Sequence, residues 1–172
     1  MNNMDAIEAI LSRRSIRKYI KKPISKKLIK ELLEVAMSAP SAGNEQPWHF
    51  IVINDTQILS QIPTFHNHAD MLKEAALAIL VCCDKNLEKH QGMGIQDCSA
   101  ATENILIAAQ AKNLGAVWLG VYPRKERIDG LMKLLKIPEC IIPISLISIG
   151  YPAEKKPSVN RYNLSRVHYD LW

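Results

Sequence analysis

The sequence lacks several features that mark whole classes of protein. No apolar run reaches the ~18–20 residues that a membrane-spanning helix needs, and the first residues do not show a signal-peptide pattern. There is also no internal repeat and no low-complexity segment. We therefore expect a cytoplasmic protein that has no membrane partner.

Cysteine is scarce, and its spacing excludes the usual cysteine motifs. None of the 4 cysteines belongs to a C-x-x-C pair, so the sequence supports neither a zinc site nor a dithiol redox motif. Cys82 and Cys83 follow the apolar run 77–81, where a thiol behaves as a small hydrophobic group. We expect these two, with Cys98 and Cys140, to be reduced and buried.

Length and composition predict one domain that covers residues 1–172. With 48% apolar residues, the chain can bury a core without disulfides or a structural metal. Residues 151–172 are the exception, because their large hydrophobic side chains show too little periodicity for a core of their own. This segment is predicted to be an arm that packs on another surface; its large hydrophobic residues are Tyr162, Val167, Tyr169 and Trp172.

Positive charge is concentrated near the amino terminus. The net charge is +5, yet the window from Arg13 to Lys30 holds basic residues and no acidic one, and acidic residues outnumber basic ones elsewhere. A local cluster of this kind indicates an anionic ligand or partner. Arg13, Arg14 and Arg17, with the Ser15 hydroxyl, could hold a phosphate by charge-assisted hydrogen bonds. A solvated basic helix end is the alternative interpretation.

Residues 40–47 form a second unusual stretch, between a predicted helix and a predicted strand. Two prolines, a glycine and an asparagine favour a compact turn there. Its small side chains would let the backbone approach a flat ligand closely, while Ser41, Asn44 and Gln46 offer polar side chains. The stretch therefore favours a docking surface for a heteroaromatic ring, although an ordinary connecting loop is also consistent with it.

Hydrophobic periodicity predicts alternating helices and strands. A first helix is capped by Asn3 or Asp5, a second by Ser25, and a third by Asp97 or Ser99. The second helix buries a stripe that ends at Met37. The predicted helices end near residue 12 and at 37, 112 and 135, and the predicted strands cover 48–53, 75–83, 116–121 and 141–149. Taken alone, this alternation favours a parallel α/β sheet.

Two further stretches bear on function. Residues 54–74 are polar and predicted to be irregular, with His66 and His68 as exposed loop histidines and not metal ligands. A mobile loop there could cover a site. Gly120 ends a predicted strand, where a glycine lets the backbone approach a ligand.

Several motifs together carry a resemblance that covers nearly the full chain. The first two are the basic segment and the proline-bounded turn, and the others occur in the third helix, at the end of the third strand and before the arm. They read Arg13-Arg14-Ser15-Ile16-Arg17, Pro40-Ser41-Ala42-Gly43-Asn44-Glu45-Gln46-Pro47-Trp48-His49-Phe50, Asp97-Cys98-Ser99-Ala100-Ala101-Thr102-Glu103-Asn104, Trp118-Leu119-Gly120-Val121, and Gly150-Tyr151-Pro152-Ala153-Glu154 with Arg161. In these motifs the chain resembles the nitroreductase family of FMN-dependent NAD(P)H oxidoreductases.

The resemblance implies a fold that differs from the parallel sheet. It implies an α+β, three-layer α-β-α sandwich with a mainly antiparallel central sheet. It also implies a homodimer with two FMN molecules at the interface and the arm 151–172 crossing to the partner subunit.

The resemblance also implies roles for individual residues. Arg13, Arg14 and Ser15 would face the FMN phosphate and ribityl chain, Arg161 would close the phosphate site, and Arg17 would lie near the pyrimidine edge. The other subunit would contribute Pro40, Ser41, Ala42 and Asn44 to the ring site, Gly120 and Val121 would offer a backbone N–H to flavin N5, and Asn67 would contact the ring. Asp70 stands where some relatives carry a lysine. No metal and no catalytic side chain are expected, because the flavin carries the chemistry.

The function implied is hydride transfer from NADH or NADPH through FMN to a small electron-poor acceptor, such as a nitroaromatic or a quinone, in a ping-pong cycle. A flavin-dependent dehalogenase, a flavin-fragmenting enzyme and a flavin carrier are alternatives. A nucleic-acid-binding module is a further alternative, but no nucleic-acid partner is expected. Trp48, Phe50 and Trp118 lie in apolar runs and are not interleaved with the basic residues, as a base-stacking surface would require.

Overall fold

The computed structural model describes residues 4–172, so Asn3, one of the two predicted caps, lies outside the described part. Asp5 is the observed cap of helix α1 (Ala6–Ser12), because its carboxylate accepts from the N–H groups of Ile7 and Glu8. The second predicted cap is confirmed, since Ser25 Oγ accepts from the first turn of α2 (Lys26–Met37).

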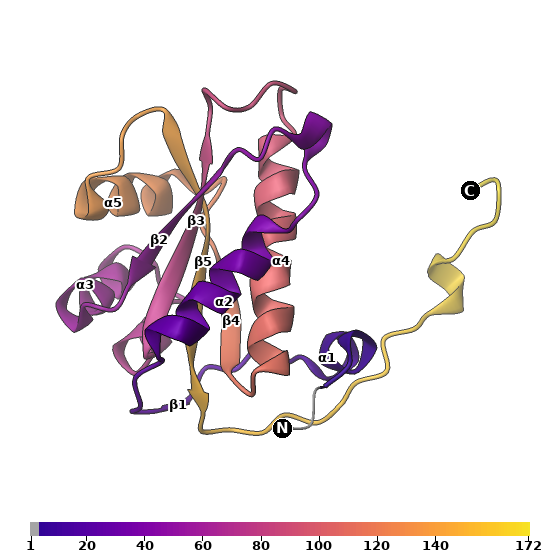
Figure 1. The fold of residues 1–172 in the computed structure, drawn as a ribbon, viewed down its shortest axis with the longest axis horizontal. Helices are drawn as coiled ribbons and strands as arrows, with labels where there is room; N and C mark the ends of the chain where they lie inside the picture. Colours follow the sequence, from indigo (N-terminus) through magenta and orange to yellow (C-terminus); the bar gives the residue numbers. More distant parts are fainter. Residues whose placement is uncertain (1–3) are drawn as a thin grey trace.

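A five-stranded sheet forms the centre of the molecule (Figure 1). Its strands are β1 (Tyr19–Ile20), β2 (Trp48–Ile53), β3 (Leu77–Asp84), β4 (Gly115–Gly120) and β5 (Ile141–Pro152). Strand β5 pairs with β1, β3 and β4, and β3 also pairs with β2.

Every one of these strand pairings is antiparallel, so the parallel sheet suggested by the alternation of strands and helices is wrong. The α+β class and the mainly antiparallel sheet are confirmed. Strands β3 and β4 do run in the same direction, on either side of helix α4 (Gly94–Ala111) in the chain. They are not neighbours, however, because the last strand, β5, lies between them and runs the opposite way.

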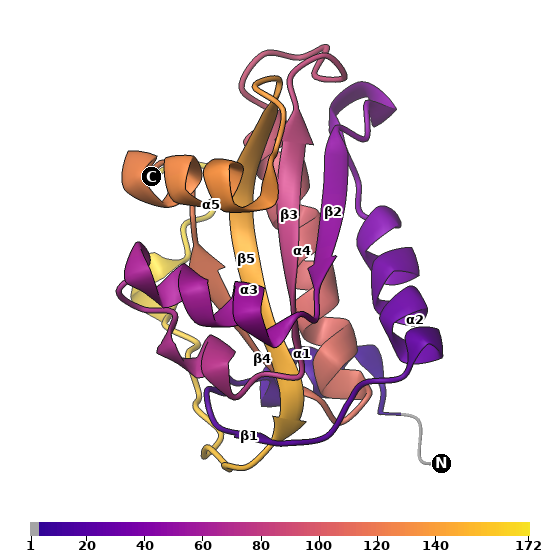
Figure 2. The same ribbon diagram turned by 90° about the vertical axis from the view of Figure 1, so that its left-hand side faces the viewer.

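Helices cover both faces of the sheet (Figure 2). Helices α2 and α4 pack on one face, and α3 (Thr56–Gln61) and α5 (Lys125–Leu135) lie on the other. Each face has its own buried apolar cluster, which contains Leu32 and Ile105 on the first and Leu59 and Leu131 on the second. This explains why β3 is apolar and buried from Leu77 to Cys83.

The structure corrects three local predictions. Residues 54–74 are not irregular throughout, because Asp55 caps α3 and short 3-10 turns follow it. Helix α4 starts at Gly94, so Asp97 lies within its first turn and is not its cap. Met37 is exposed, although it was assigned to the buried stripe of α2. The four cysteines are free, as expected, and three of them are buried, whereas Cys140 is half-buried.

After β5 the chain forms an arm that extends away from the sheet (Figure 1). The arm contains one short 3-10 turn, Leu164–Arg166, and its large apolar side chains are exposed. Tyr169 is 79% exposed and Trp172 fully so, and exposed apolar side chains gathered in one segment indicate an interaction surface. Among residues 4–172, no helix is long and apolar enough to cross a membrane.

Candidate functional site

The basic segment after α1 is fixed beside β4. The N–H of Ile16 donates to the carbonyl of Ala116 at 3.0 Å, and Ser15 forms an isolated parallel bridge with the same residue. Glycine permits this approach, since a Cβ at Gly115 would lie 2.6 Å from Ile16. The Tyr19 hydroxyl donates to the Ile16 carbonyl at 2.7 Å, so both backbone groups of Ile16 are hydrogen-bonded.

Three of the predicted phosphate ligands line one cavity. Arg13, Arg14 and Arg161 border a space of about 580 Å³ where the end of α1 meets the arm. The Arg13 guanidinium also pairs with Glu103 of α4, with 3.2 Å between Nε and Oε1. The structure therefore brings together arginines that are far apart in the sequence.

Arg14 has a second task within the chain. Its Nε donates to the Pro157 carbonyl at 2.9 Å, and Nη1 donates to the carbonyls of Leu11 and Arg13. Its buried Nη2 has no partner within residues 4–172. Arg14 thus ties α1 to the arm, and Nη2 is the part of its guanidinium left for an anion.

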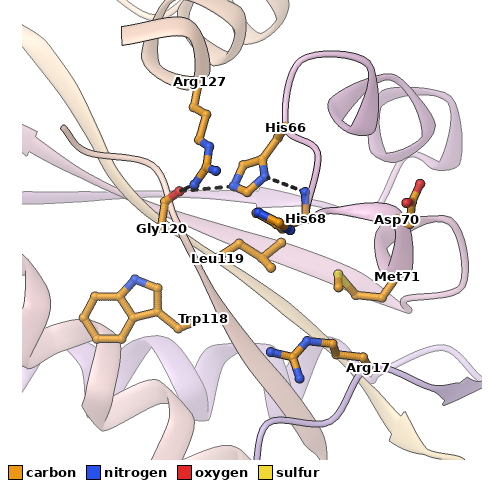
Figure 3. A pocket seen from close by; sticks show the side chains of 9 residues that line it. All are labelled: Arg17, His66, His68, Asp70, Met71, Trp118, Leu119, Gly120 and Arg127. Carbon is orange, nitrogen blue, oxygen red and sulfur yellow. Dashed lines mark hydrogen bonds between the residues drawn. The ribbon is translucent and has the colours of Figure 1, made fainter. Parts of the chain in front are cut away.

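Arg17 and Gly120 line a second cavity, of about 400 Å³ (Figure 3). Its wall also includes Trp118 on β4 and His66 and His68 on the loop after α3. A Cβ built at Gly120 would meet nothing within 4 Å, so the backbone there faces open space. This cavity has room for the edge of a flat ligand.

His66 was predicted to be exposed, and the structure shows that it is buried. Its Nε2 lies 3.1 Å from the Gly120 carbonyl oxygen, and its Nδ1 accepts the N–H of His68 at 3.4 Å. These partners require the proton on Nε2. Burial, reinforced by the Arg127 guanidinium, lowers the pKa of His66. Arg127 Nη1 donates to the same Gly120 carbonyl at 2.6 Å, so two side chains hold this peptide group (Figure 3).

Of the two predicted backbone donors, Gly120 is the better placed. The Val121 N–H already donates to the Ile144 carbonyl of β5 at 3.3 Å, and Val121 is buried. Because groups in an antiparallel ladder alternate in direction, the N–H and C=O of Gly120 point away from β5. Asn67 is exposed on the same loop as His66 and does not line the cavity.

The turn at residues 40–47 is compact, as predicted, but its side chains bond to one another. Ser41 Oγ accepts from the Gln46 N–H at 3.0 Å, and the Gln46 amide donates to Asn44 Oδ1 at 3.2 Å. Gly43, Asn44 and Gln46 all have positive φ, between 47° and 56°. The turn therefore presents a fixed surface of small groups around Pro40 and Ala42.

Two buried carboxyl groups that the sequence analysis did not select hold this turn in place. Glu45 Oε2 accepts from the N–H groups of Lys89 and His90, and Asp97 Oδ1 accepts from the Ala42 N–H at 3.1 Å. Burial raises the pKa of Asp97. Burial also acts to raise the pKa of Glu45, but the His90 and Lys89 N–H groups outweigh it and lower that pKa. Hydrogen bonds to these two carboxyl groups therefore fix the turn.

Residues 40–47 of the turn line neither of the two cavities. The turn contacts Asp97 in the first turn of α4, whereas the residue before Arg13 contacts the other end, where Gln110 donates to Ser12 at 3.1 Å. Gln110 lies thirteen positions after Asp97 in the helix, which corresponds to about 20 Å. The predicted site residues therefore form two separate groups on the chain.

Comparison with known proteins identifies close relatives. The model of the nitroreductase family matches residues 10–80 and 65–151. A Methanothermobacter thermautotrophicus protein named for NADH dehydrogenase and NAD(P)H nitroreductase activities is 47% identical over 172 residues, which is 100% of this chain and 90% of that protein. A crystal structure from Parabacteroides distasonis, named for the same activities, has a TM-score of 0.93 and 40% identity over 97% of this chain and 98% of its own. A Desulfovibrio desulfuricans structure in complex with FMN has a TM-score of 0.84 and 30% identity, and covers 97% of each chain.

Proposed function

The chain belongs to the nitroreductase family, and from that premise we propose that it is an FMN-dependent oxidoreductase that uses NADH or NADPH. The observation that carries the proposal is the pair of neighbouring cavities on either side of the segment 13–17. One contains three arginines, and the other contains Arg17 and the open backbone of Gly120.

The residues present fit FMN. A phosphate needs several charge-assisted donors, and the arginine cavity offers Arg13, Arg161 and the unpartnered Nη2 of Arg14. A flavin ring needs an uncrowded backbone donor at one edge, which Gly120 supplies. In this assignment Ser15 is a further phosphate contact. Asn67 and Val121 are left out, because Asn67 does not line the cavity and the Val121 N–H is already bonded within the sheet.

The chain's own groups orient and tune the cofactor. FMN, when bound, accepts a hydride from the nicotinamide and passes electrons on to a second substrate. Arg17 places a positive charge where reduction of the ring develops negative charge, and so favours the reduced state. His66 and Arg127 hold Gly120 by its carbonyl oxygen. The N–H of Gly120 would then fix the orientation of the ring.

We further propose that the site is completed in a homodimer. The turn at Pro40, Ser41, Ala42 and Asn44 lies about 20 Å along α4 from the end that contacts Ser12, so it would serve the ring bound by the partner. The arm's exposed tyrosines and Trp172 would be covered by the same association. The second substrate, a nitroaromatic or a quinone, would enter the cleft after the nicotinamide leaves, which gives ping-pong kinetics.

An anaerobic titration tests the proposal. The purified protein is loaded with FMN, freed of unbound cofactor and mixed with NADH or NADPH, and the flavin absorbance is followed. Bleaching by either nucleotide, followed by reoxidation with a quinone, is the expected result. A protein that retains no FMN, or whose bound flavin is bleached by neither nucleotide, would contradict the proposal.

A further inference from the structure

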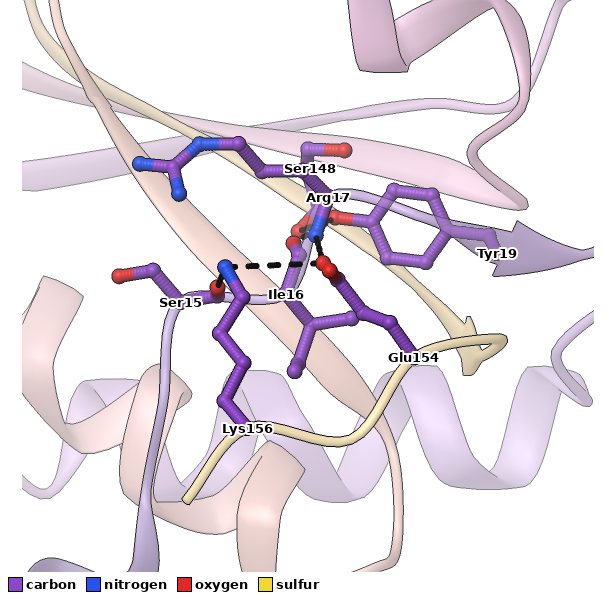
Figure 4. A network of polar contacts seen from close by, with 7 residues as sticks. All are labelled: Ser15, Ile16, Arg17, Tyr19, Ser148, Glu154 and Lys156. Atoms are coloured by element: carbon purple, nitrogen blue, oxygen red, sulfur yellow. Dashed lines mark hydrogen bonds and ion pairs between the residues drawn. The ribbon is translucent and has the colours of Figure 1, made fainter. Parts of the chain in front are cut away.

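The first residues of the arm run alongside the basic segment of the same chain (Figure 4). Four hydrogen bonds join the two stretches in succession. The Ala153 N–H donates to the Lys18 carbonyl at 2.9 Å, and the Arg17 N–H donates to Glu154 Oε1 at 2.6 Å. Lys156 Nζ donates to the Ser15 carbonyl at 2.5 Å. Arg14 Nε donates to the Pro157 carbonyl at 2.9 Å.

Glu154 is the central group of this series. Its carboxylate is half-buried, accepts the Arg17 N–H, and forms an ion pair with Lys156 at 3.6 Å. The Arg17 N–H and the Lys156 ammonium hold the pKa of this carboxyl below its usual value. The one carboxylate thus fixes the backbone of Arg17 and, through Lys156, the carbonyl of Ser15 two residues earlier.

The contact matters because of where the Arg17 side chain goes. It leaves the anchored backbone and lines the cavity at Gly120, while Glu154 lies on the opposite side of the segment and does not line that cavity (Figure 4). A charged hydrogen bond to the backbone limits where a long, flexible side chain can place its guanidinium. Glu154 therefore acts on the cavity through Arg17 and not by contact with a ligand.

We propose that Glu154, braced by Lys156, is a positioning residue that sets the place of the Arg17 guanidinium against the flavin. The inference rests on the proposed function and deepens it. It also links two parts of the molecule, because the arm that supplies Arg161 to the phosphate cavity starts at the residues that fix Arg17.

The experiment compares Glu154→Ala with wild type by two readouts, FMN affinity from fluorescence quenching and the midpoint potential of bound FMN. Loss of the charged contact should weaken FMN binding by about tenfold. It should also make the potential more negative, since a displaced cation stabilises the reduced flavin less. Glu154→Gln keeps an oxygen for the Arg17 N–H and should restore most of both values. If the alanine variant does not fold, Lys156→Met carries the test, because it removes the cation that braces Glu154.

A double-mutant cycle with Arg17→Gln decides whether the effect passes through Arg17. In that background Glu154→Ala should no longer shift the potential. Lys156→Met removes the brace on Glu154 and should shift both readouts in the same direction as Glu154→Ala. Lys155→Met is its matched control, because Lys155 is the exposed neighbour, and should leave both readouts unchanged. The inference would be overturned if Glu154→Ala kept the wild-type FMN affinity and potential, or if it still shifted the potential fully in the Arg17→Gln background. Either result would leave the proposed function standing. Wild-type protein that binds no FMN would overturn the proposed function as well.

Discussion

The Nε2 atom of His66 lies 3.1 Å from the carbonyl oxygen of Gly120, 54 residues further along the chain. The contact joins the loop after α3 to the end of β4. It also fixes Gly120, the residue whose own N–H we assign to the flavin ring. A buried histidine in the cavity wall thus fixes the backbone that borders the proposed ligand site.

His66→Ala should destabilise the fold, because it removes a buried hydrogen-bonded side chain and leaves space behind Gly120. We expect a loss of about 2 kcal/mol in the free energy of unfolding, measured by urea denaturation. His68→Ala is the control, since His68 contributes its backbone N–H and not its exposed ring; it should stay within about 0.5 kcal/mol of wild type. Equal effects of the two variants would contradict this role of His66.

The same histidine predicts how stability depends on pH. Burial and Arg127 lower the folded-state pKa of His66 below the ordinary 6.5, so the unfolded chain binds a proton more readily than the folded one. Its contribution is complete above pH 6.5 and is lost as the pH falls through the folded-state pKa. Urea titrations between pH 7.5 and 5 should therefore show a shallower loss of stability in His66→Gln than in wild type. Parallel curves would contradict the assignment.

Gly120→Ala should separate cofactor binding from stability. The new methyl group meets no atom of the chain within 4 Å, so the melting temperature should stay near that of wild type. The methyl group would occupy space proposed for the ring, and FMN affinity should fall about tenfold or more. Gly115→Ala is the contrasting variant. Its Cβ would lie 2.6 Å from Ile16, so this substitution should lower the melting temperature. FMN affinity at the wild-type level in Gly120→Ala would remove Gly120 from the ring site.

Replacing the Asp97 carboxyl group by an amide should destabilise the fold less than removing it. Asp97→Asn keeps an oxygen for the Ala42 N–H and offers Glu45 a donor, so its free energy of unfolding at pH 7 should stay within about 1 kcal/mol of wild type. Asp97→Ala leaves the Ala42 N–H and Glu45 without this partner and should cost about 2 kcal/mol. Denaturant titrations compare the two, and an asparagine variant as unstable as the alanine variant would contradict the role of Asp97 as the acceptor of the Ala42 N–H.

Mixed dimers test whether the turn serves the partner subunit. Homodimers of Arg13→Ala should bind FMN poorly because a phosphate contact is lost. Homodimers of Ala42→Trp should bind it poorly because the new side chain obstructs the surface for the ring. Co-expression of both, with different affinity tags, should restore one functional site in each mixed dimer. Unrestored binding in purified mixed dimers would show that the two residues do not act across subunits.

Regular elements could be predicted where the signal is local. Ser25 and the apolar stripe after it define α2, and the run from Trp48 to Ile53 gives β2 with its observed bounds. The start of α4 was missed because its first N–H is satisfied by Glu88, six residues before Gly94, and not by an adjacent cap. Strand direction was missed because the position of β5 between β3 and β4 depends on pairing between distant segments.

In the candidate site, too, features with a local sequence signal could be predicted, and features that depend on distant residues could not. The arginine cluster and the turn stand out through composition, and in the structure both are fixed by hydrogen bonds to distant residues. The burial of His66 was not predictable, because its partner is a backbone carbonyl of β4 and polar neighbours surround it in sequence. Likewise, nothing near Arg14 indicates that Pro157, 143 residues away, accepts its Nε–H.

The central claim is that arginines near the amino terminus bind the phosphate of FMN. A fluorescence-quenching titration of wild type and Arg13→Ala with FMN, with circular dichroism to confirm that both are folded, tests it most directly. We predict saturable binding by wild type and an affinity at least about tenfold weaker in the variant. An unchanged affinity in folded Arg13→Ala, or no binding by wild type, would contradict the claim.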